Sequence, residues 1–173
     1  MPPFGESHYA YLGASAVAIV VVLAVVARWT RDPARVRAAI VGGLAAGAVN
    51  LVLDAVAHHE GWWTYLEART SFGPVAFYVL AGLGFASFAL IAGNLARRHG
   101  SRAVPAVAAA LFVYGIVRDH RLADQLHLMA FDTGVVPTVM DGLFEYVVPF
   151  VVAWWVTERL ARSPQAEAAV SAA

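Results

Sequence analysis

Five apolar stretches, separated by short polar segments, divide this chain. They cover residues 9–27, 38–57, 74–96, 103–117 and 143–160. Four of them approach the roughly 20 apolar residues that a helix needs to cross about 30 Å of hydrocarbon. The fourth is about fifteen residues long. We expect it to tilt little or to include flanking residues in the membrane span. The pattern predicts an all-α polytopic membrane bundle of about five transmembrane helices, with residues 1–163 as a single transmembrane domain.

Two further segments have different patterns. Residues 118–134, RDHRLADQLHLMAFDTG, place His120, Asp124 and His127 on one face of a helix and leucines on another. This is typical of an amphipathic segment that lies in the membrane interface. Residues 164–173 lack aromatic or leucine anchors, so we expect them to form a disordered cytoplasmic tail.

Composition supports the membrane class. Hydrophobic residues make up 60% of the chain, and the mean hydropathy is +0.65, which argues against a soluble globule. Cysteine is absent, which excludes disulfides and thiolate metal sites. The formal net charge is zero, and we expect no nucleic-acid partner.

Arginine is distributed unevenly between the two ends of the predicted helices. Nine arginines follow the first, third and fifth stretches, against three in the other segments: Arg28, Arg31, Arg35, Arg37, Arg97, Arg98, Arg102, Arg159 and Arg162, against Arg69, Arg118 and Arg121. The positive-inside rule therefore predicts a protein of the cell membrane with its amino terminus outside and its carboxy terminus in the cytoplasm. No basic residue precedes the first stretch, so we expect it to remain attached rather than to be cleaved as a signal peptide.

This orientation gathers titratable groups at the outer end. Nine of the twelve acids and five of the six histidines fall there: Glu6, Asp54, Glu60, Glu67, Asp119, Asp124, Asp132, Asp141 and Glu145, with His8, His58, His59, His120 and His127. Acids contribute little to positive-inside sorting, and the histidine bias does not follow from it. Any chemistry is expected at this end.

The second stretch carries polar residues on one face. The residues that share this face, at spacings of three and four, are Gly43, Gly47, Asn50, Asp54 and His58. The first two form a small-xxx-small motif, which lets another helix approach closely. Small residues on the third stretch make a comparable seam, so we expect these two helices to pair. An Asp inside hydrocarbon is costly and is a functional candidate by default. The alternative is that the amide and the carboxylate only hydrogen-bond across helices as packing groups.

The fifth stretch begins with a pair of acids. Asp141 and Glu145 are four residues apart and therefore share a helical face. Because two adjacent carboxylates beside hydrocarbon cannot both ionise at low cost, one is expected to hold its proton and to serve as a general acid. Pro149 lacks the N–H that the Glu145 carbonyl would accept, which predicts a kink. Alternatively, Asp141 marks the start of the helix.

Histidines suggest a different class of site. His58, His120, Asp124 and His127 form a candidate set of ligands for a transition metal. Facing histidines such as His58 and His127 are also compatible with haem, although nothing in their spacing selects it. An amphipathic helix in the interface produces the same pattern without any ligand.

Aromatic residues follow the second stretch in the segment DAVAHHEGWWTY. Trp62, Trp63 and Tyr65 fit the aromatic belt of a membrane interface. Rings beside acids also stabilise a carbocation through their negative faces. The two interpretations are compatible.

The spacing of Asp54, Gly61, Trp63 and Tyr65 resembles the signature of the small membrane-embedded lycopene cyclases of the heterodimeric bacterial and archaeal type. The resemblance covers about forty residues, 50–87. It implies that acids at the membrane edge protonate the end of a linear polyene, which then closes into a ring without redox change. That family has a proline and paired glutamates on the next helix, whereas residues 74–96 contain Pro74 and no acid. Either Glu145 serves in their place, or the chain shares the scaffold and not the reaction.

The leading hypothesis is an acid–base enzyme that cyclises or isomerises a lipid or isoprenoid, with no cofactor. Its catalytic candidates are Asp54, Glu145, His58, Glu60 and Asp141, and its substrate-binding candidates are Asn50, Trp62, Trp63 and Tyr65. The alternatives are a metal- or haem-binding protein of the outer face and a non-catalytic proton-coupled or structural subunit. A homodimer or a heteromeric membrane partner is compatible with the small-residue seams.

Overall fold

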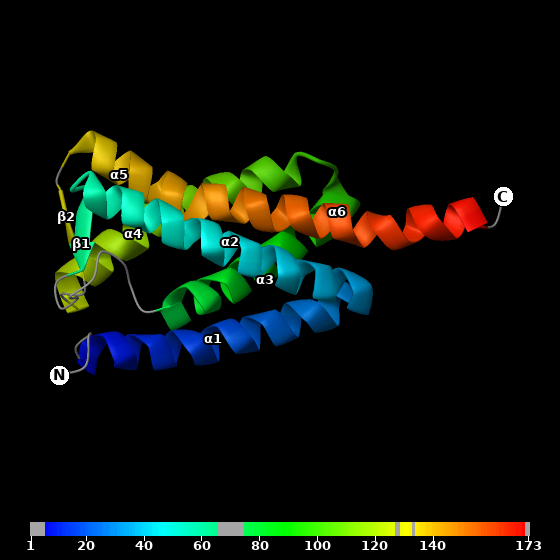
Figure 1. The fold of residues 1–173 in the computed structure, drawn as a ribbon, viewed down its shortest axis with the longest axis horizontal. Helices are drawn as coiled ribbons and strands as arrows, with labels where there is room; N and C mark the ends of the chain where they lie inside the picture. The colour runs from blue at the N-terminus through cyan, green and yellow to red at the C-terminus, as the bar shows by residue number, and fades with distance from the viewer. Residues whose placement is uncertain (1–5, 66–74, 127–128, 133, 172–173) are drawn as a thin grey trace.

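The computed structural model describes residues 6–65, 75–126, 129–132 and 134–171, with side chains described for 9–65, 75–121, 129–132 and 134–162. Its helices run side by side, and the two termini lie at opposite ends of the bundle (Figure 1). The helices are α1 (Glu6–Thr30), α2 (Pro33–His59), α3 (Val75–His99), α4 (Ala103–Leu126), α5 (Val135–Asp141), the π-helix η1 (Gly142–Val147) and α6 (Val148–Ser171). Two short antiparallel strands, β1 (Trp63–Tyr65) and β2 (Met129–Phe131), complete the fold.

The described residues contain five helical spans long and apolar enough to cross a membrane. They are Tyr9–Thr30, Pro33–His59, Val75–His99, Ala103–Arg121 and Val135–Arg162. The predicted membrane bundle is therefore confirmed. We name its two ends by content: the strand end holds β1, β2 and the amino terminus, and the arginine end holds the carboxy termini of α1 and α3 (Figure 1).

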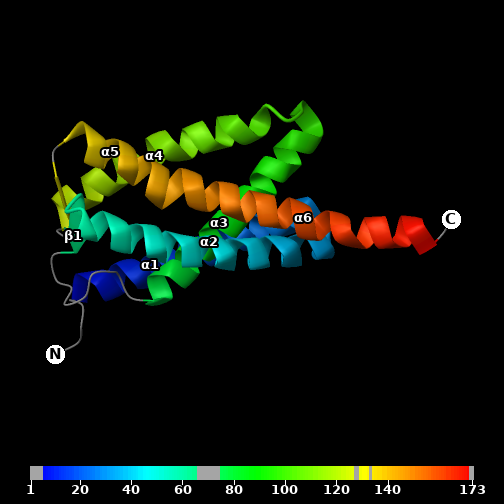
Figure 2. The ribbon, with the colours of Figure 1, turned by 45° about the horizontal axis from the view of Figure 1, so that its top comes forward.

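The packing centres on α2, which contacts α3 on one side and α6 on the other (Figure 2). Gly43 lies directly against the backbone of Gly82, and Gly47 lies against the carbonyl of Tyr78. On the other side, a Cβ on Gly42 would lie 2.5 Å from the carbonyl oxygen of Ala153. The predicted pairing of the second and third helices is thus confirmed, because these glycines allow backbone contact that no larger residue permits.

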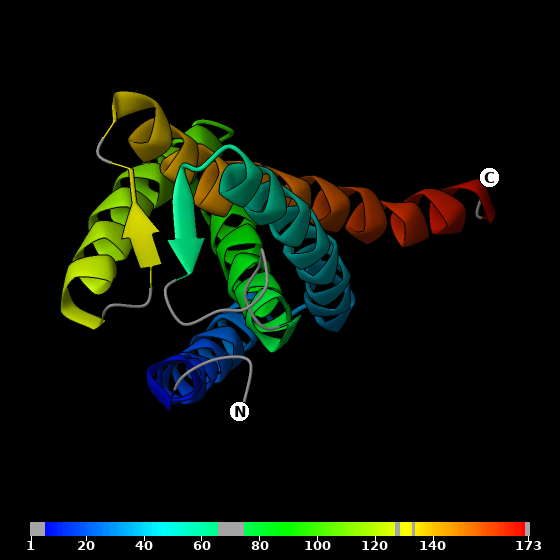
Figure 3. The ribbon, with the colours of Figure 1, turned by 60° about the vertical axis from the view of Figure 1, so that its left-hand side comes forward.

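α1 is packed differently. It contacts mainly α3, lies to one side of the bundle (Figure 3), and exposes Val17, Val20, Val21 and Val25. In a bilayer, such an apolar surface faces lipid.

The fourth helix extends beyond its apolar run. α4 continues through the charged residues 118–121 to Leu126, and β2 follows shortly afterwards. Residues 118–126 are therefore continuous with α4, and the candidate membrane span within this helix ends at Arg121. His127, Leu128 and Thr133 lie outside the described residues.

The fifth span starts earlier than predicted. α5 begins at Val135, so Asp141 is the last residue of α5, is fully buried, and makes no side-chain cap hydrogen bond. The idea that Asp141 marks the start of the helix is therefore wrong. The π-helix that follows ends two residues before Pro149, and π segments and prolines are both common causes of helix bends.

Most of the predicted tail, residues 164–173, lies within the range of the last helix. α6 continues to Ser171 and projects beyond the bundle at the arginine end (Figure 1). Residues 164–171 contain three alanines, one glutamine and one glutamate, all of them residues with high helix propensity.

The close approach of α2 and α3 gives a first prediction. In Gly43→Ala the new methyl group meets the Gly82 carbonyl and the Ala86 side chain, and overpacking of this kind costs about 1–3 kcal/mol. Gly13→Ala is the matched control, because no described atom lies within 4 Å of a Cβ at Gly13. Thermal unfolding in detergent should show Gly43→Ala destabilised and Gly13→Ala unchanged or slightly stabilised. Equal stability of the two variants would contradict this packing.

Candidate functional site

The chain reverses sharply after α2, and this turn builds one side of the site. Gly61 has φ 73°; its N–H donates to His58 O (3.1 Å), and the N–H of Trp62 donates to Ala57 O (3.0 Å). These two bonds form a Schellman motif, which requires a left-handed residue and favours glycine there. The turn directs β1 back along the end of α2.

Residues of β1 then reach Asp54, one helical turn before His58. Alternate residues of a strand share a face, and both Trp63 and Tyr65 donate to this carboxylate: Trp63 Nε1 to Oδ1 at 2.7 Å, and Tyr65 OH to Oδ2 at 3.0 Å. Tyr78 OH of α3 donates to Oδ2 as well. Asp54 and Trp63 are almost completely buried. The carboxylate therefore joins α2, β1 and α3.

Asn50 lies one turn further into α2 and connects it to η1. Its Nδ2 donates to Glu145 Oε2 at 3.0 Å, and both residues are buried. The other carboxylate oxygen, Glu145 Oε1, is buried without a hydrogen-bond partner among the described residues. One oxygen of this acid is thus held by Asn50, while the other is buried without a hydrogen-bond partner among the described residues.

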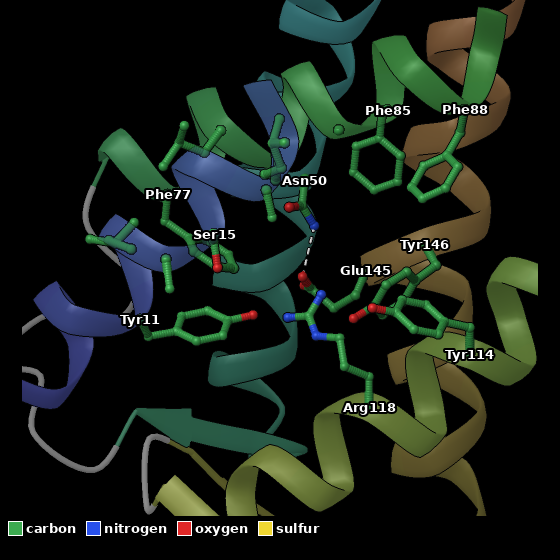
Figure 4. Close-up of a pocket in the computed structure, with 17 residues that line it drawn as sticks. Tyr11, Ser15, Asn50, Phe77, Phe85, Phe88, Tyr114, Arg118, Glu145 and Tyr146 are labelled. Carbon is green, nitrogen blue, oxygen red and sulfur yellow. Dashed lines mark hydrogen bonds between the residues drawn. The ribbon is translucent and has the colours of Figure 1, made fainter. Parts of the chain in front are cut away.

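The structure contains a cavity of about 490 Å³ beside Glu145 (Figure 4). Its wall is mostly apolar and aromatic, and it is formed by α1, α3, α4 and η1, with Asn50 from α2. The lining residues are Tyr11, Leu12, Ala14, Ser15, Ala18, Ile19, Asn50, Phe77, Leu80, Ala81, Gly84, Phe85, Phe88, Tyr114, Arg118, Glu145 and Tyr146. A largely apolar cavity of this size with a few convergent polar groups is typical of a small-molecule site.

Arg118 brings the only guanidinium group to this wall among the described lining residues. Its Nε lies 2.9 Å from Asp119 Oδ1, and its guanidinium lies over the rings of Tyr11 and Tyr146 at 5.8 and 5.6 Å. Tyr146 OH donates to Asp119 Oδ2 at 2.7 Å. The positive charge is therefore paired within α4 and does not face the cavity alone.

The Asp141 carboxyl group lies close enough to Asp119 to interact with it. It is fully buried, and neither of its carboxylate oxygens has a hydrogen-bond partner among the described residues. A buried carboxyl group without a partner is much less costly in its protonated form. Asp141 does not line the cavity.

The other predicted site residues lie outside the cavity lining. Asp54 and Trp63 belong to the hydrogen-bond network that joins α2, β1 and α3. Trp62 packs against Phe144 with ring centroids 5.6 Å apart. Glu60 caps the carboxyl end of α2 and is exposed. His58 is half-buried, and its Nδ1 has no hydrogen-bond partner among the described residues. The aromatic wall of the cavity comes instead from Phe77, Phe85, Phe88 and Tyr114.

The proposed metal ligands do not form a group in the described part of the chain. There, no cluster of three or more His, Asp or Glu residues could hold a metal ion. His120 stacks on the Phe131 ring with centroids 4.7 Å apart. The Asp124 side chain and His127 lie outside the described residues.

Sequence reasoning missed several residues of the site, above all Tyr78, Arg118 and the cavity phenylalanines. A helical periodicity analysis of α4 could have placed Asp119 on the same face as Gly115 and Phe112, which pack against η1. The phenylalanines of α3 carry no such signal, because an aromatic on a membrane helix is ordinarily a lipid-facing or packing residue.

The chain was compared with protein-family models, with curated proteins and with solved structures, and no match was found. The fold and the site therefore rest on the chain's own residues.

The Asp54 network gives a second prediction. Asp54→Ala removes the shared acceptor of three buried or half-buried donors, each costing about 1–3 kcal/mol when unsatisfied. We expect the free energy of unfolding to fall by about 3 kcal/mol or more. Glu60→Ala removes an exposed acid six residues later and should change it little. Thermal unfolding of both variants measures the difference, and equal stability would show that the network contributes nothing.

Tyr65 gives a prediction for pH. Burial, together with the neighbouring Asp54 carboxyl group, raises the pKa of the Tyr65 phenol well above its ordinary value. The folded protein holds this proton more tightly than the unfolded chain. The stability from Tyr65 is therefore fully present below the ordinary phenol pKa of about 10 and is lost as the pH rises beyond it.

In Tyr65→Phe this titration is absent, so the free energy of unfolding should fall less steeply with pH in the alkaline range than in the unmodified protein. Denaturant unfolding at a series of alkaline pH values measures the two slopes. Identical slopes would mean that Tyr65 is not held in its protonated form by the fold.

Proposed function

We propose that this integral membrane protein is an acid–base enzyme that acts on an apolar isoprenoid, with Glu145 as the acid. One observation carries the proposal. Glu145 is a buried carboxyl group whose Oε2 is fixed by Asn50, while its Oε1 has no partner among the described residues, at the wall of a cavity lined mainly by apolar and aromatic side chains.

The surroundings of Glu145 favour proton donation to a weak base. A charged carboxylate is expensive in a membrane span, and the apolar cavity offers it little solvation. The neutral, protonated group is therefore the resting form in this proposal. Asn50 orients it through a hydrogen bond that either protonation state can accept.

The reaction class follows from the lining. An alkene has no polar group to bind, so a site for it consists of an acid and an apolar wall. Glu145 donates a proton to a terminal carbon–carbon double bond, and the resulting carbocation is attacked by a neighbouring double bond to form a ring carbon–carbon bond. Loss of a proton from the adjacent carbon to the Glu145 carboxylate restores the acid. The sum is a cyclisation or isomerisation without redox change.

Ring faces supply the stabilisation that a carbocation needs. Phe77, Phe85 and Phe88 line the cavity on α3, and their negative faces attract a cation within about 6 Å. Arg118 would oppose a cation if its charge were free, but Asp119 pairs with it at 2.9 Å. The wall therefore carries little net charge.

The resemblance to the lycopene cyclases supports the substrate class, although the proposed acid lies on a different helix from the paired glutamates of that family. The segment from Asp54 to Tyr65 accounts for the shared spacing, and in this proposal it holds β1 against the bundle. Glu145 takes the place of the paired glutamates that residues 74–96 lack. A linear polyene such as lycopene is therefore the first substrate to test.

Glu145→Gln is the corresponding variant, because it keeps the size of the side chain and cannot donate an acidic proton. In cells that accumulate lycopene, coexpression of the unmodified chain should yield cyclised pigment. Glu145→Gln should lower its formation by about 100-fold or more, as is common for loss of a general acid, whereas Glu60→Gln should leave it unchanged. Pigment extraction and chromatography measure all three, with protein levels checked by immunoblot.

A second readout does not depend on the substrate. A hydrophobic carbodiimide reacts with protonated carboxyl groups in apolar surroundings, so Glu145 should be labelled in purified protein and Glu60 should not, as judged by peptide mass spectrometry. Labelling without any pigment change would retain the acid and remove lycopene as substrate. If Glu145 is not labelled and the pigment does not change, the acids are packing groups of a structural subunit.

A further inference from the structure

A second hollow lies at the opposite end of the molecule from Glu145. It has a volume of about 500 Å³ and is lined by Val25, Arg28, Trp29, Arg31 and Arg98. The first four residues come from the end of α1 and the turn that follows, and Arg98 comes from the last turn of α3. Nothing argued for this hollow depends on the function proposed for Glu145.

The charge in this hollow is of one sign. Three guanidinium groups line it, and no carboxylate does. The nearest acid in sequence, Asp32, instead caps α2, where its Oδ1 accepts from the backbone N–H of Ala34 and Arg35 at 3.0 and 3.1 Å. By contrast, Arg35 has an internal partner, since its Nη2 pairs with Glu158 Oε1. The hollow therefore presents cations that no described carboxylate neutralises.

The local structure holds these side chains together. The Arg98 guanidinium lies 5.2 Å from the centroid of the Trp29 ring, which restricts both side chains. Arg31 has φ 56°, a left-handed conformation that is unfavourable for a residue other than glycine. This conformation turns the chain between α1 and α2 at the hollow.

Ordinary helix-end electrostatics explains part of this pattern. Arg28 and Arg98 lie in the last turns of α1 and α3, where a cation interacts favourably with the helix macrodipole. That effect accounts for a basic residue at each helix end. It does not account for their convergence, with Arg31 and an aromatic ring, on one concave site.

We propose that this hollow binds the phosphate headgroup of an anionic phospholipid. Arginine forms forked hydrogen bonds that match phosphate oxygens, and basic pockets between membrane helices are suited to lipid headgroups. The apolar side chains on the same helix continue away from the site, because Val17, Val21 and Val25 are all exposed along α1. They provide a surface along which the acyl chains of the same lipid lie.

The test compares two double variants with the same change in charge. Arg28→Gln with Arg98→Gln removes two cations from the hollow, while Arg37→Gln with Arg102→Gln removes two exposed cations that do not line it. Both proteins are placed in phosphatidylcholine nanodiscs containing increasing phosphatidylglycerol, and the retained phosphatidylglycerol is counted by native mass spectrometry. Binding by the hollow variant should be about tenfold weaker than by the control, which corresponds to the loss of strong Arg–phosphate contacts.

Two outcomes would overturn the proposal. Equal weakening in both double variants would indicate general attraction to a negative membrane surface. Protection of the unmodified protein from thermal unfolding by inorganic phosphate alone, to the same extent as by phosphatidylglycerol, would indicate a site for a free anion. Arg28→Gln alone serves as the milder variant, and unfolding in pure phosphatidylcholine confirms that each variant is folded.

Discussion

The hydrogen bond from Asn50 to Glu145 is the interaction on which the arrangement of polar groups inside this bundle depends. Both residues lie within spanning helices, where water does not compensate a polar group and the protein itself must do so. The bond joins α2 to η1. Glu145 lines the cavity, its Oε1 has no hydrogen-bond partner among the described residues, and the glycine contacts of α2 with α3 and α6 bring these helices close together. A helix bundle held together by apolar contacts alone would not fix an acid in this position.

The Asp54 network performs a different task at the same end. Its three donors come from a strand and a neighbouring helix, so this carboxylate organises the fold around it. The left-handed turn at Gly61 and the alternation of Trp63 and Tyr65 along β1 give a physical reason for the spacing Asp, Gly, Trp and Tyr. A glycine is needed to reverse the chain, and two residues on the same face of the strand are needed to reach one acid. The motif describes how the strand β1 is attached to α2 and α3, and the acid proposed for chemistry lies elsewhere, on η1.

Much of the fold could be predicted from hydrophobic pattern alone, because span length and small-residue spacing are local properties. The five spans and the contact of Gly43 and Gly47 with α3 are of this kind. The start of the last span was missed because residues 135–142 are only moderately apolar and contain Pro137 and Gly142. The role of Trp63 was missed because an interfacial tryptophan has a general explanation. Arg118 and the α3 phenylalanines could not be assigned to a cavity from one sequence, since their meeting depends on how α1, α3 and α4 are placed relative to η1.

The central claim is that Asn50 and Glu145 are energetically coupled inside the bundle. A double-mutant cycle measures this directly, using Asn50→Leu, Glu145→Leu and the combined variant, with the free energy of unfolding determined in mixed micelles. Loss of either partner leaves the other buried and unsatisfied, so the double variant should be more stable than the sum of the single effects predicts, by about 1 kcal/mol. Strictly additive effects would contradict the account, because they would mean that the two side chains do not interact in the folded protein.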